Sequence, residues 1–594
     1  MARPKIQERT PDLLRVEPFL GLNVSQAAEQ INDHQSPDLL NVIVSKTGNL
    51  DKRTGYKKAF TTSLGSGRIT GMYLYRKIDD TKVFLFGWDT KLYKLENGAP
   101  VLLSSTFSGN ELSFFVMNNK CYIQDGTKMQ VTDGVTVSDI VPYIPTVSIS
   151  KTPLGGGTPF EDFNLLGGGF KDSFSGDGTA KDYQLSFSGI DADKVTATVD
   201  GANKVEGTDF TVNRTSGKVT FTTAPTKGTN NVIITGYKRR QDLERKIHKC
   251  RINVLYGGAN DTRVFVAGNV DLLNVMYGSG VNDPTYFPEN RFYQIGADSE
   301  YIMNFAKQFD TLVIIKERSI WGMSFELKDG VPSYPTKPLN DTTGAVSRNS
   351  VQVLDNTPVM FNDKGVFSLT SSNVRDERNV SLISEDINPA LLVEANKQNA
   401  KTIDYDRKYF LALNNRVYVY DYDIKSWYQF DNINACNFLE VDGRLYFGAL
   451  DKGMIYMFMK PTDTYPYNDD GKAINAYWKS KLFTFDADEL KKMVDKVFFS
   501  LKVGKASSAD LYYITNKKYS NLIKNVEING FMDFRFLDFN NFTFNTSAFP
   551  KEAAARIKAK KITHFQILFK NDRLNEGMGI SSAAIKYRYM SYIK

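Results

Sequence analysis

Four aspartates stand in two close pairs, and paired carboxylates are the groups in this chain that could carry acid–base chemistry. Asp421 and Asp423 follow an aromatic run, and Asp469 and Asp470 lie in a polar stretch further on. A glycosidase needs two carboxylates about 5–10 Å apart across a cleft. Acidic residues are far commoner in the turns between strands, so the sequence favours turn positions over an active site.

Residue types suited to metal binding or nucleophilic chemistry are few and widely spaced. The chain has three histidines and three cysteines: His34, His248, His564, Cys121, Cys250 and Cys436. They form no HExxH motif, no CxxC motif and no mixed Cys/His spacing, so we expect buried thiols made in a reducing cytoplasm. GxSxG and GxxxxGK[ST] motifs are absent from the sequence as well. The sequence therefore predicts no catalytic residue, no metal, no cofactor and no enzyme activity.

A basic cluster, KRRQDLERKIHKCR, begins at Lys238. Such a run could meet phosphate groups or an acidic protein face. Because Asp242 and Glu244 interrupt it, a solvated helix or linker is the favoured interpretation.

The elements that must position these residues are mainly β-strands in several domains. A chain of 594 residues divides into roughly three to five domains of about 100–200 residues. Its aromatic share of 13% favours pleated, half-buried surfaces. The net charge of +7, from 74 basic and 67 acidic residues, disfavours a dedicated DNA-binding protein. The start of the chain lacks the apolar region of a signal peptide, and no apolar stretch is long enough to span a membrane, so we expect a soluble chain.

Strand–turn–strand units recur along the chain. They begin at Val83, Cys121, Val264, Leu312, Val359, Tyr409 and Arg444. Their spacing is roughly 36–51 residues, apart from one step of about 143, against a propeller-blade period of roughly 40–50. The spacing predicts a β-propeller with one inserted module, and it places Trp88, Trp321 and Trp427 in the blade core.

The inserted module and the chain ends complete the predicted organisation. Short strands with Asp-Gly and Ser-Gly turns predict a small β-sandwich over 170–237, preceded by a flexible Gly/Pro linker. After Pro461 we expect a β-rich domain, with a basic helix over 551–561. The predicted divisions are an N-terminal platform segment (1–67), a first propeller portion (68–154), the sandwich with its linkers (155–245), the remaining propeller (246–460) and the C-terminal β-rich domain (461–594).

The segment from Phe19 to Ala59 carries a family resemblance. Within it, LNVIVSKTGNLDKRTGY predicts a hairpin with a Thr-Gly-Asn turn and an exposed basic strand end. The segment resembles the opening of the tail nozzle proteins of short-tailed phages, also called tail tubular protein B or head-completion stabilisation proteins. The matching positions are Gly21, Leu22, Asn23, Pro37, Asp38, Leu40, Asn41, Val42, Gly48, Leu50, Lys52, Arg53, Gly55 and Tyr56. The sequence departs from the family pattern at Thr54, where proline often stands.

This resemblance implies a structural virion protein, synthesised in the host cytoplasm and built into the phage tail. It implies a homo-oligomeric ring, typically a hexamer, beneath the adaptor (head-to-tail connector) ring, with tail fibres or spikes as further candidate partners. Viral DNA would pass through the lumen without sequence specificity, so that the ring helps to retain and then release the genome. Asn41, Lys52, Arg53 and Tyr56 are the candidate residues for the interface with the adaptor or a neighbouring subunit.

Two other functions stay open at this point. One is a phage tail protein that binds or depolymerises a host glycan through the propeller and the sandwich. The other is a propeller-type interaction scaffold of a cell. Formation of a ring without glycan affinity would separate the nozzle from both.

Overall fold

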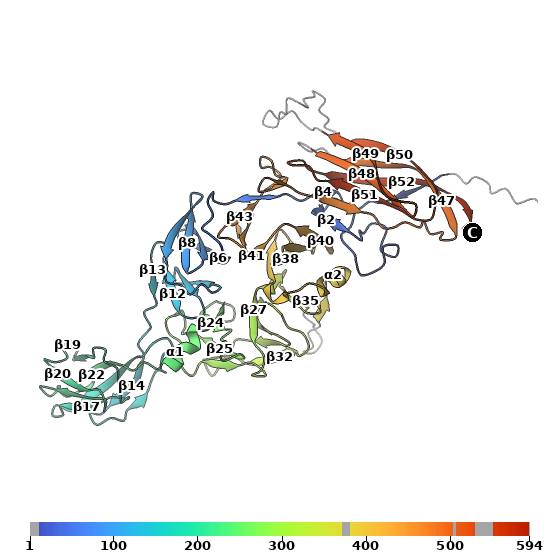
Figure 1. Ribbon diagram of the computed structural model, residues 1–594. Helices are drawn as coiled ribbons and strands as arrows, with labels where there is room; N and C mark the ends of the chain where they lie inside the picture. Colours follow the sequence, from blue (N-terminus) through green and yellow to red (C-terminus); the bar gives the residue numbers. More distant parts are fainter. Residues whose placement is uncertain (1–10, 371–379, 503–506, 529–549, 593–594) are drawn as a thin grey trace, which may run out of the picture. The chain divides into compact units, whose positions relative to one another are not determined.

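The computed structural model describes residues 11–370, 380–502, 507–528 and 550–592. The chain is mainly β: a β-propeller with an inserted β-sandwich and a β-rich terminal domain, as the sequence predicts (Figure 1). Its residues fall into two compact units. Unit 1 contains residues 1–69 and 349–594, except 372–378. Unit 2 contains residues 70–348. Each unit is described by itself below.

Unit 2 contains blades in which consecutive strands pair in an antiparallel meander. Their strands are β6 (Ile69–Arg76), β7 (Lys82–Trp88), β8 (Lys91–Glu96) and β9 (Ala99–Ser104); β10 (Ser113–Met117), β11 (Lys120–Gln124), β12 (Met129–Thr132) and β13 (Val137–Asp139); β23 (Ile252–Tyr256), β24 (Arg263–Ala267), β25 (Val275–Gly278) and β26 (Phe292–Gln294); and β27 (Ile302–Gln308), β28 (Thr311–Lys316), β29 (Ile320–Met323) and β32 (Thr336–Asn340). A side hairpin joins β30 (Glu326–Lys328) to β31 (Val331–Ser333). The first strands of three successive blades, β10, β23 and β27, lie next to one another, which is the radial arrangement of a propeller.

Unit 1 contains further blades of the same kind. Their strands are β33 (Gln352–Leu354), β34 (Thr357–Asn362), β35 (Gly365–Leu369) and β36 (Val380–Leu382); β37 (Lys401–Tyr405), β38 (Lys408–Leu413), β39 (Arg416–Asp421) and β40 (Ser426–Asp431); and β41 (Ala435–Val441), β42 (Arg444–Ala449) and β43 (Ile455–Phe458). The last blade gains its fourth strand from the N-terminal segment, because β5 (Tyr56–Lys58) pairs with β43. The short strands β44 (Asn468–Asp469) and β45 (Lys472–Ala473) extend the same sheet.

The seven hairpins expected from the sequence are confirmed as paired strands within the blades. Local turn chemistry explains why they were visible. Several tight turns place two consecutive residues at positive φ, as at Asn414–Asn415 and Asp442–Gly443. Such turns match the right-handed twist of the strands and favour Asn, Asp and Gly, which tolerate positive φ.

The inserted sandwich is made of two sheets. The larger contains β15 (Thr158–Pro159), β14 (Thr146–Lys151), β16 (Gly169–Gly176), β22 (Gly228–Tyr237), β18 (Thr196–Val199) and β19 (Ala202–Lys204); the smaller contains β17 (Asp182–Gln184), β21 (Lys218–Phe221) and β20 (Phe210–Asn213). The sandwich therefore begins before Phe170, because β14 pairs in parallel with β16.

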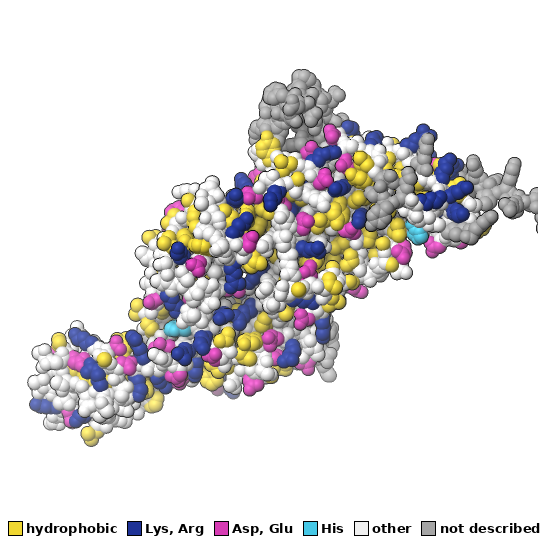
Figure 2. All heavy atoms as spheres, in the orientation of Figure 1, with side chains coloured by type: hydrophobic (Ala, Val, Ile, Leu, Met, Phe, Trp, Pro, Cys, Tyr) yellow, Lys and Arg dark blue, Asp and Glu magenta, His cyan; other side chains and the backbone are white. Residues whose placement is uncertain are grey.

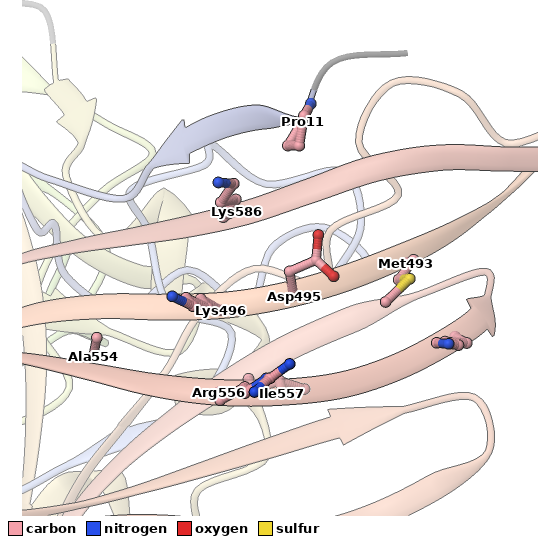
Figure 3. A pocket seen from close by; sticks show the side chains of 9 residues that line it. Pro11, Met493, Asp495, Lys496, Ala554, Arg556, Ile557 and Lys586 are labelled. Atoms are coloured by element: carbon pink, nitrogen blue, oxygen red, sulfur yellow. The ribbon is translucent and has the colours of Figure 1, made fainter. Parts of the chain in front are cut away.

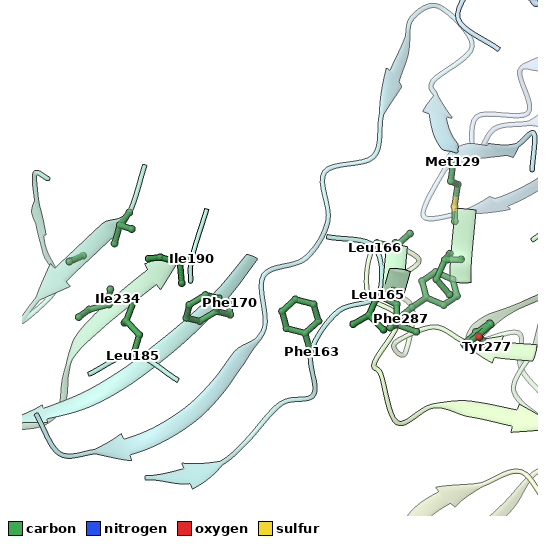
Figure 4. Packing of buried hydrophobic residues seen from close by; sticks show 14 of the residues in the cluster. Met129, Phe163, Leu165, Leu166, Phe170, Leu185, Ile190, Ile234, Tyr277 and Phe287 are labelled. Atoms are coloured by element: carbon green, nitrogen blue, oxygen red, sulfur yellow. The ribbon is translucent and has the colours of Figure 1, made fainter. Parts of the chain in front are cut away.

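The stretch that leads into the sandwich is packed, which corrects the expectation of a flexible Gly/Pro linker. Phe163, Leu165 and Leu166 are buried in one hydrophobic cluster with sandwich residues such as Phe170 and with Phe287, which lies between β25 and β26 (Figure 4). Leu165 N–H also donates to Phe287 O at 2.8 Å. A Cβ at Gly168 would clash with the backbone of Arg239, so close packing explains that glycine better than flexibility does.

The basic run that follows the sandwich forms a helix, α1 (Gln241–His248), with Leu243 and Ile247 buried. Just before it, the Arg240 guanidinium lies 4.4 Å from the centre of the Phe163 ring and pairs with Glu289 at 2.9 Å. The run is therefore anchored on one side. Other short helices in the described residues are α2 (Asn388–Leu392) and the 3-10 turns η1 (Arg348–Ser350), η2 (Glu385–Ile387) and η3 (Lys397–Asn399).

The terminal domain of unit 1 is also built of two sheets. One contains β3 (Val42–Val44), β4 (Leu50–Lys52), β52 (Gly579–Tyr592), β47 (Leu490–Leu501) and β50 (Lys551–Ile562), with β1 (Asp12–Arg15) paired to β52; the other contains β2 (Leu39–Leu40), β46 (Ala476–Lys479), β51 (Phe565–Asn571), β48 (Ser507–Thr515) and β49 (Lys518–Ile528). Phe499 and Phe569 meet between the sheets with ring centres 5.5 Å apart. Strands from both ends of the chain thus share each sheet.

The helix expected over 551–561 is wrong, because this segment is strand β50. Its small and apolar side chains alternate with charged ones: Ala553, Ala555, Ile557 and Ala559 are buried, whereas Arg556 and Lys560 are exposed. Alternation of period two suits a half-buried strand, and pairing with β47 overrides the helix propensity of alanine and lysine.

The three tryptophans expected in the blade core differ in burial. Trp427 of β40 is 1% exposed, and its indole N–H donates to Ile383 O at 2.8 Å. Trp88 and Trp321 are half-buried. Trp321 packs at the edge of a core cluster, and Lys91 lies 5.7 Å from the Trp88 ring centre. Trp427 is therefore the one of the three that fills a closed core site.

Trp427→Ala should lower the free energy of unfolding by about 3–5 kcal/mol, because a large buried side chain is removed and the surrounding blade cannot fully collapse. Trp427→Phe, which keeps most of the volume, should cost clearly less. Chemical denaturation of the two variants measures the difference. Equal, small losses for both would mean that Trp427 does not fill a closed site.

Candidate functional site

The four residues predicted to face a partner lie inside unit 1, between the last blade and the terminal domain. Asn41, Lys52, Arg53 and Tyr56 are 0%, 3%, 3% and 7% exposed. The hairpin that carries them is present, since β3 and β4 pair from Val42–Lys52 to Val44–Leu50. The expectation that the basic end of this strand is exposed is wrong, because both cations point into the chain and are hydrogen-bonded there.

Arg53 is the centre of this site. Its guanidinium binds Asp469 with two hydrogen bonds of 2.8 and 2.7 Å. Its Nε donates to Asn41 Oδ1 at 2.8 Å, and its remaining N–H groups reach the carbonyls of Thr54 and Asp431 at 3.1 and 3.0 Å. A guanidinium has five N–H donors, so every donor of this buried group is satisfied.

Asn41 completes the arrangement around Arg53. Its amide N–H₂ donates to Asp431 Oδ1 at 2.6 Å and to Asn475 O at 2.8 Å. Its Oδ1 accepts from Arg53 and also from Asp431 N–H at 3.1 Å. Asn41 has a φ of +55°, a conformation that asparagine tolerates better than most residues. We call Asn41, Arg53, Asp431 and Asp469 the Arg53 clamp.

Lys52 holds the opposite side of the same hairpin. Its ammonium donates to Asn571 Oδ1 at 2.7 Å, to Glu576 O at 3.0 Å and to Arg573 O at 3.2 Å. Asn571 is the last residue of β51, and the other two acceptors lie between β51 and β52, so Lys52 ties β4 to that connection. Burial, and then the neighbouring Arg53 charge, lowers the pKa of Lys52 from 10.5 to about 8.

Tyr56 fixes the next strand, β5, on the last blade. Its hydroxyl donates to Asn432 O at 2.7 Å. Its ring meets those of Phe447 and Tyr456 edge-on, with centres 5.0 Å apart in each case. Burial raises the pKa of Tyr56 above its ordinary value, so the hydroxyl keeps its proton and its role as donor.

A cavity of about 330 Å³ adjoins the clamp within unit 1, and Lys52, Arg53 and Phe430 contribute to its wall. Two further cations of the wall are paired: Lys408 lies 3.4 Å from Asp421, and Lys502 lies 3.1 Å from Asp51. Lys460 lines the cavity as well. The cavity has room for a small molecule, and most of its cations are engaged in internal contacts.

The aspartates weighed as an acid–base pair are all held by cations. Asp469 belongs to the clamp, Asp421 faces Lys408, and Asp470 lies 3.5 Å from Lys58. Asp423 pairs with Lys46 and Arg407, both at 2.6 Å, and these contacts lower its pKa. A general acid at neutral pH needs the opposite, a raised pKa, so this set favours structural roles.

Metal-ligating and nucleophilic side chains do not come together in a site within the described part of the chain. Within those residues there is no cluster of His, Cys, Asp or Glu suited to a metal ion. The three cysteines are free and buried, as expected, and burial raises the pKa of Cys121 to about 12. His248 lines a cavity of about 250 Å³, where burial lowers its pKa. The described helices include none long and apolar enough to cross a membrane.

Comparison with known proteins gives only distant structural likeness. No protein-family model matches the chain, and a search of curated proteins gives no match. Among solved structures, an exo-β-1,3-galactanase from Phanerochaete chrysosporium is 10% identical, with a TM-score of 0.21 over 56% of this chain and 95% of that one. The extracellular domain of a one component system from B. thetaiotaomicron is also 10% identical, with a TM-score of 0.27 over 90% of this chain and 63% of the other. Scores this low carry no functional argument.

Sequence reasoning found the basic half of the clamp and missed the acidic half. Asp469 was noted only as a candidate acid within a polar linker. It lies 416 positions from Arg53 along the chain, and no local pattern links the two. The one local signal is a basic residue two positions before the Gly55-Tyr56 pair, and exposure is the usual state of such a residue.

Asp469→Ala should lower the free energy of unfolding by about 3–5 kcal/mol, because it leaves a buried guanidinium without its counter-charge. The neighbouring Asp470→Ala is the matched control, since its pair with Lys58 is partly exposed and such pairs contribute about 0–1 kcal/mol. Urea denaturation of both variants measures the contrast. Similar losses at the two positions would contradict the clamp.

Lys52 predicts a pH signature. Its pKa is lower in the folded chain than in the unfolded chain, so the unfolded state binds more protons between pH 8 and 10.5, and this residue's contribution to stability rises with pH in that window. Wild type should gain about 2 kcal/mol over Lys52→Met between pH 7 and 10. Lys364→Met, at an exposed turn, should follow the wild type. Parallel curves for wild type and Lys52→Met would contradict the buried ammonium.

Proposed function

We propose that this chain is a structural protein of a phage virion, the tail nozzle of a short-tailed phage. It would form a homo-oligomeric ring, expected to be a hexamer, that attaches to the adaptor ring and continues the path of the DNA. Tail fibres or spikes are further candidate partners. The genome would be retained by the assembled ring and released through it, without catalysis by this chain.

The observation that carries the proposal is the role of the nozzle-like segment in this structure. Its characteristic residues anchor the N-terminal chain rather than line a reactive site: Arg53 and Asn41 form the clamp, and Tyr56 fixes β5 to the last blade. Two of its glycines are needed for close approach. A Cβ at Gly21 would overlap Trp427 O, and one at Gly55 would overlap Asn468 O. A motif made of anchors fits a protein whose work is to be a rigid body.

The distribution of charge supports the same proposal. The excess is +7 over 594 residues. On the face seen in Figure 2, basic and acidic side chains are intermingled. DNA must slide through a conduit, and weak or mixed charge suits this better than a strongly basic lining, which would hold phosphates.

The residues once expected at the adaptor interface take a different place in this proposal. Lys52 and Arg53 are positioning residues, because all their donors are used inside the chain. The surface that meets the adaptor must then be made of other residues, whose arrangement the clamp and Lys52 hold in place.

The purified chain should assemble into rings. Size-exclusion chromatography with light scattering should give a mass of about six chains, and negative-stain images should show end-on particles with a central opening. Mixing with the adaptor ring should give a longer, coaxial particle.

A monomer that binds oligosaccharides, or that releases reducing sugar from a capsule or lipopolysaccharide preparation, would contradict the proposal and favour the glycan-binding alternative. A monomer without glycan affinity would instead favour a propeller-type scaffold.

A further inference from the structure

A groove of about 760 Å³ crosses one face of the terminal domain, over strands β52, β47 and β50 and beside Pro11, which precedes β1 (Figure 3). Four cations line it: Lys496 of β47, Arg556 and Lys560 of β50, and Lys586 of β52. The opposite face of the same sheet is apolar and buried, as Val497 and Phe499 show. The groove is therefore the outward face of an otherwise well-packed sheet.

Strand register places three of these cations side by side. Lys496 is directly opposite Arg556 on one neighbouring strand and directly opposite Lys586 on the other. Adjacent strands are about 4.8 Å apart, and like charges at opposed positions destabilise a sheet. Further along β47, Lys560 and Arg588 flank Met493. The sheet thus concentrates positive charge where its own stability gains nothing from it.

Acidic side chains in the groove do not neutralise this charge. The carboxylate that lines the groove is that of Asp495, and its Oδ2 lies 3.9 Å from Arg588 Nε. Within the described residues, Lys496, Arg556, Lys560 and Lys586 have no carboxylate within 4.0 Å. By contrast, two other cations of the domain are paired, Lys502 with Asp51 and Lys570 with Asp572. An anion from outside the chain would complete the groove.

Apolar side chains lie beside the charged row. Leu13, 51% exposed, stands opposite Lys586 in the sheet. Phe498, 37% exposed, lies two residues along β47 from Lys496 and is flanked by Ala554 and Ala584. A phosphate backbone would meet only the cations. A protein segment would use both surfaces, as aromatic and arginine side chains commonly do in interfaces.

We propose that this groove is the docking site for an acidic, extended segment of a partner protein. Its Asp or Glu side chains would pair with Lys496, Arg556 and Lys586, and its apolar side chains would cover Leu13 and Phe498. The inference concerns this surface alone and does not depend on the ring or the conduit, so it can fail while the proposed function holds.

The test is a binding titration with the full chain. The probe is a fluorescein-labelled peptide of about 12 residues in which Glu alternates with Leu and Phe, and competitors are the same peptide with Lys for Glu and a short DNA duplex. We expect salt-sensitive binding of the acidic peptide, no competition by the basic peptide, and weaker competition by DNA.

Two double variants locate the binding. K496E/R556E should weaken binding of the acidic peptide at least about tenfold. K364E/K472E makes an equal charge change at exposed positions elsewhere in unit 1 and should leave peptide binding unchanged. Phe498→Ala should weaken binding of the acidic peptide and leave DNA binding unchanged. Absence of peptide binding, binding that K496E/R556E does not weaken, or tighter binding of DNA than of peptide would overturn the proposal.

Because K496E/R556E could lose binding by misfolding, the thermal midpoint of a milder variant is measured as a control. Lys496→Gln removes the central cation of the row, so it should raise the thermal midpoint at low salt and lose that gain at high salt. The same variant should bind the peptide more weakly. A lower midpoint for Lys496→Gln would contradict the repulsion on which the proposal rests.

Discussion

The buried pairing of Arg53 with Asp469 is the constraint on which the arrangement of unit 1 depends. Removing a guanidinium from water is costly unless its donors are all met, and here two carboxylate oxygens, one amide and two carbonyls meet them. The partners come from the N-terminal segment, the end of β40 and strand β44. The arrangement of these three segments meets all five donors, and removing one partner would leave a buried charge unmet.

The clamp lies between two strands with different tasks. Just before it, β4 belongs to a sheet of the terminal domain, and just after it, β5 completes the last blade. The chain can pass from one to the other only at a fixed point, and Gly55 allows the close approach to Asn468 at that point. Lys52 and Tyr56 secure the strand on either side. A short segment near the start of the chain therefore joins blade and terminal domain within unit 1, which is the property that the proposed nozzle role requires.

Features that depend on local chemistry could be predicted from the sequence, and features that depend on distant partners could not. The blade hairpins were visible because residues such as Asn414 and Asn415 specify tight turns, and the inserted sandwich was visible for the same reason. Residues 551–561 have the Ala and Lys content of a helix, and the pairing with β47 that makes them strand β50 is not local. Arg53 was expected at the surface because its counter-charge is remote in sequence. The basic groove could not be foreseen, since it exists only through the register of Lys496 with Arg556 and Lys586.

Hydrogen exchange followed by mass spectrometry would test most directly whether the N-terminal segment is a fixed part of the fold. The account predicts that amides of residues 50–58 exchange as slowly as those of strands β41 to β43, because β4 and β5 are each paired within a sheet of unit 1 and most of residues 50–56 are buried. It also predicts that Asp469→Ala accelerates exchange in 50–58 before it affects β37 to β39. Fast exchange of 50–58 in the wild type would contradict the clamp and, with it, the structural role assigned to the segment.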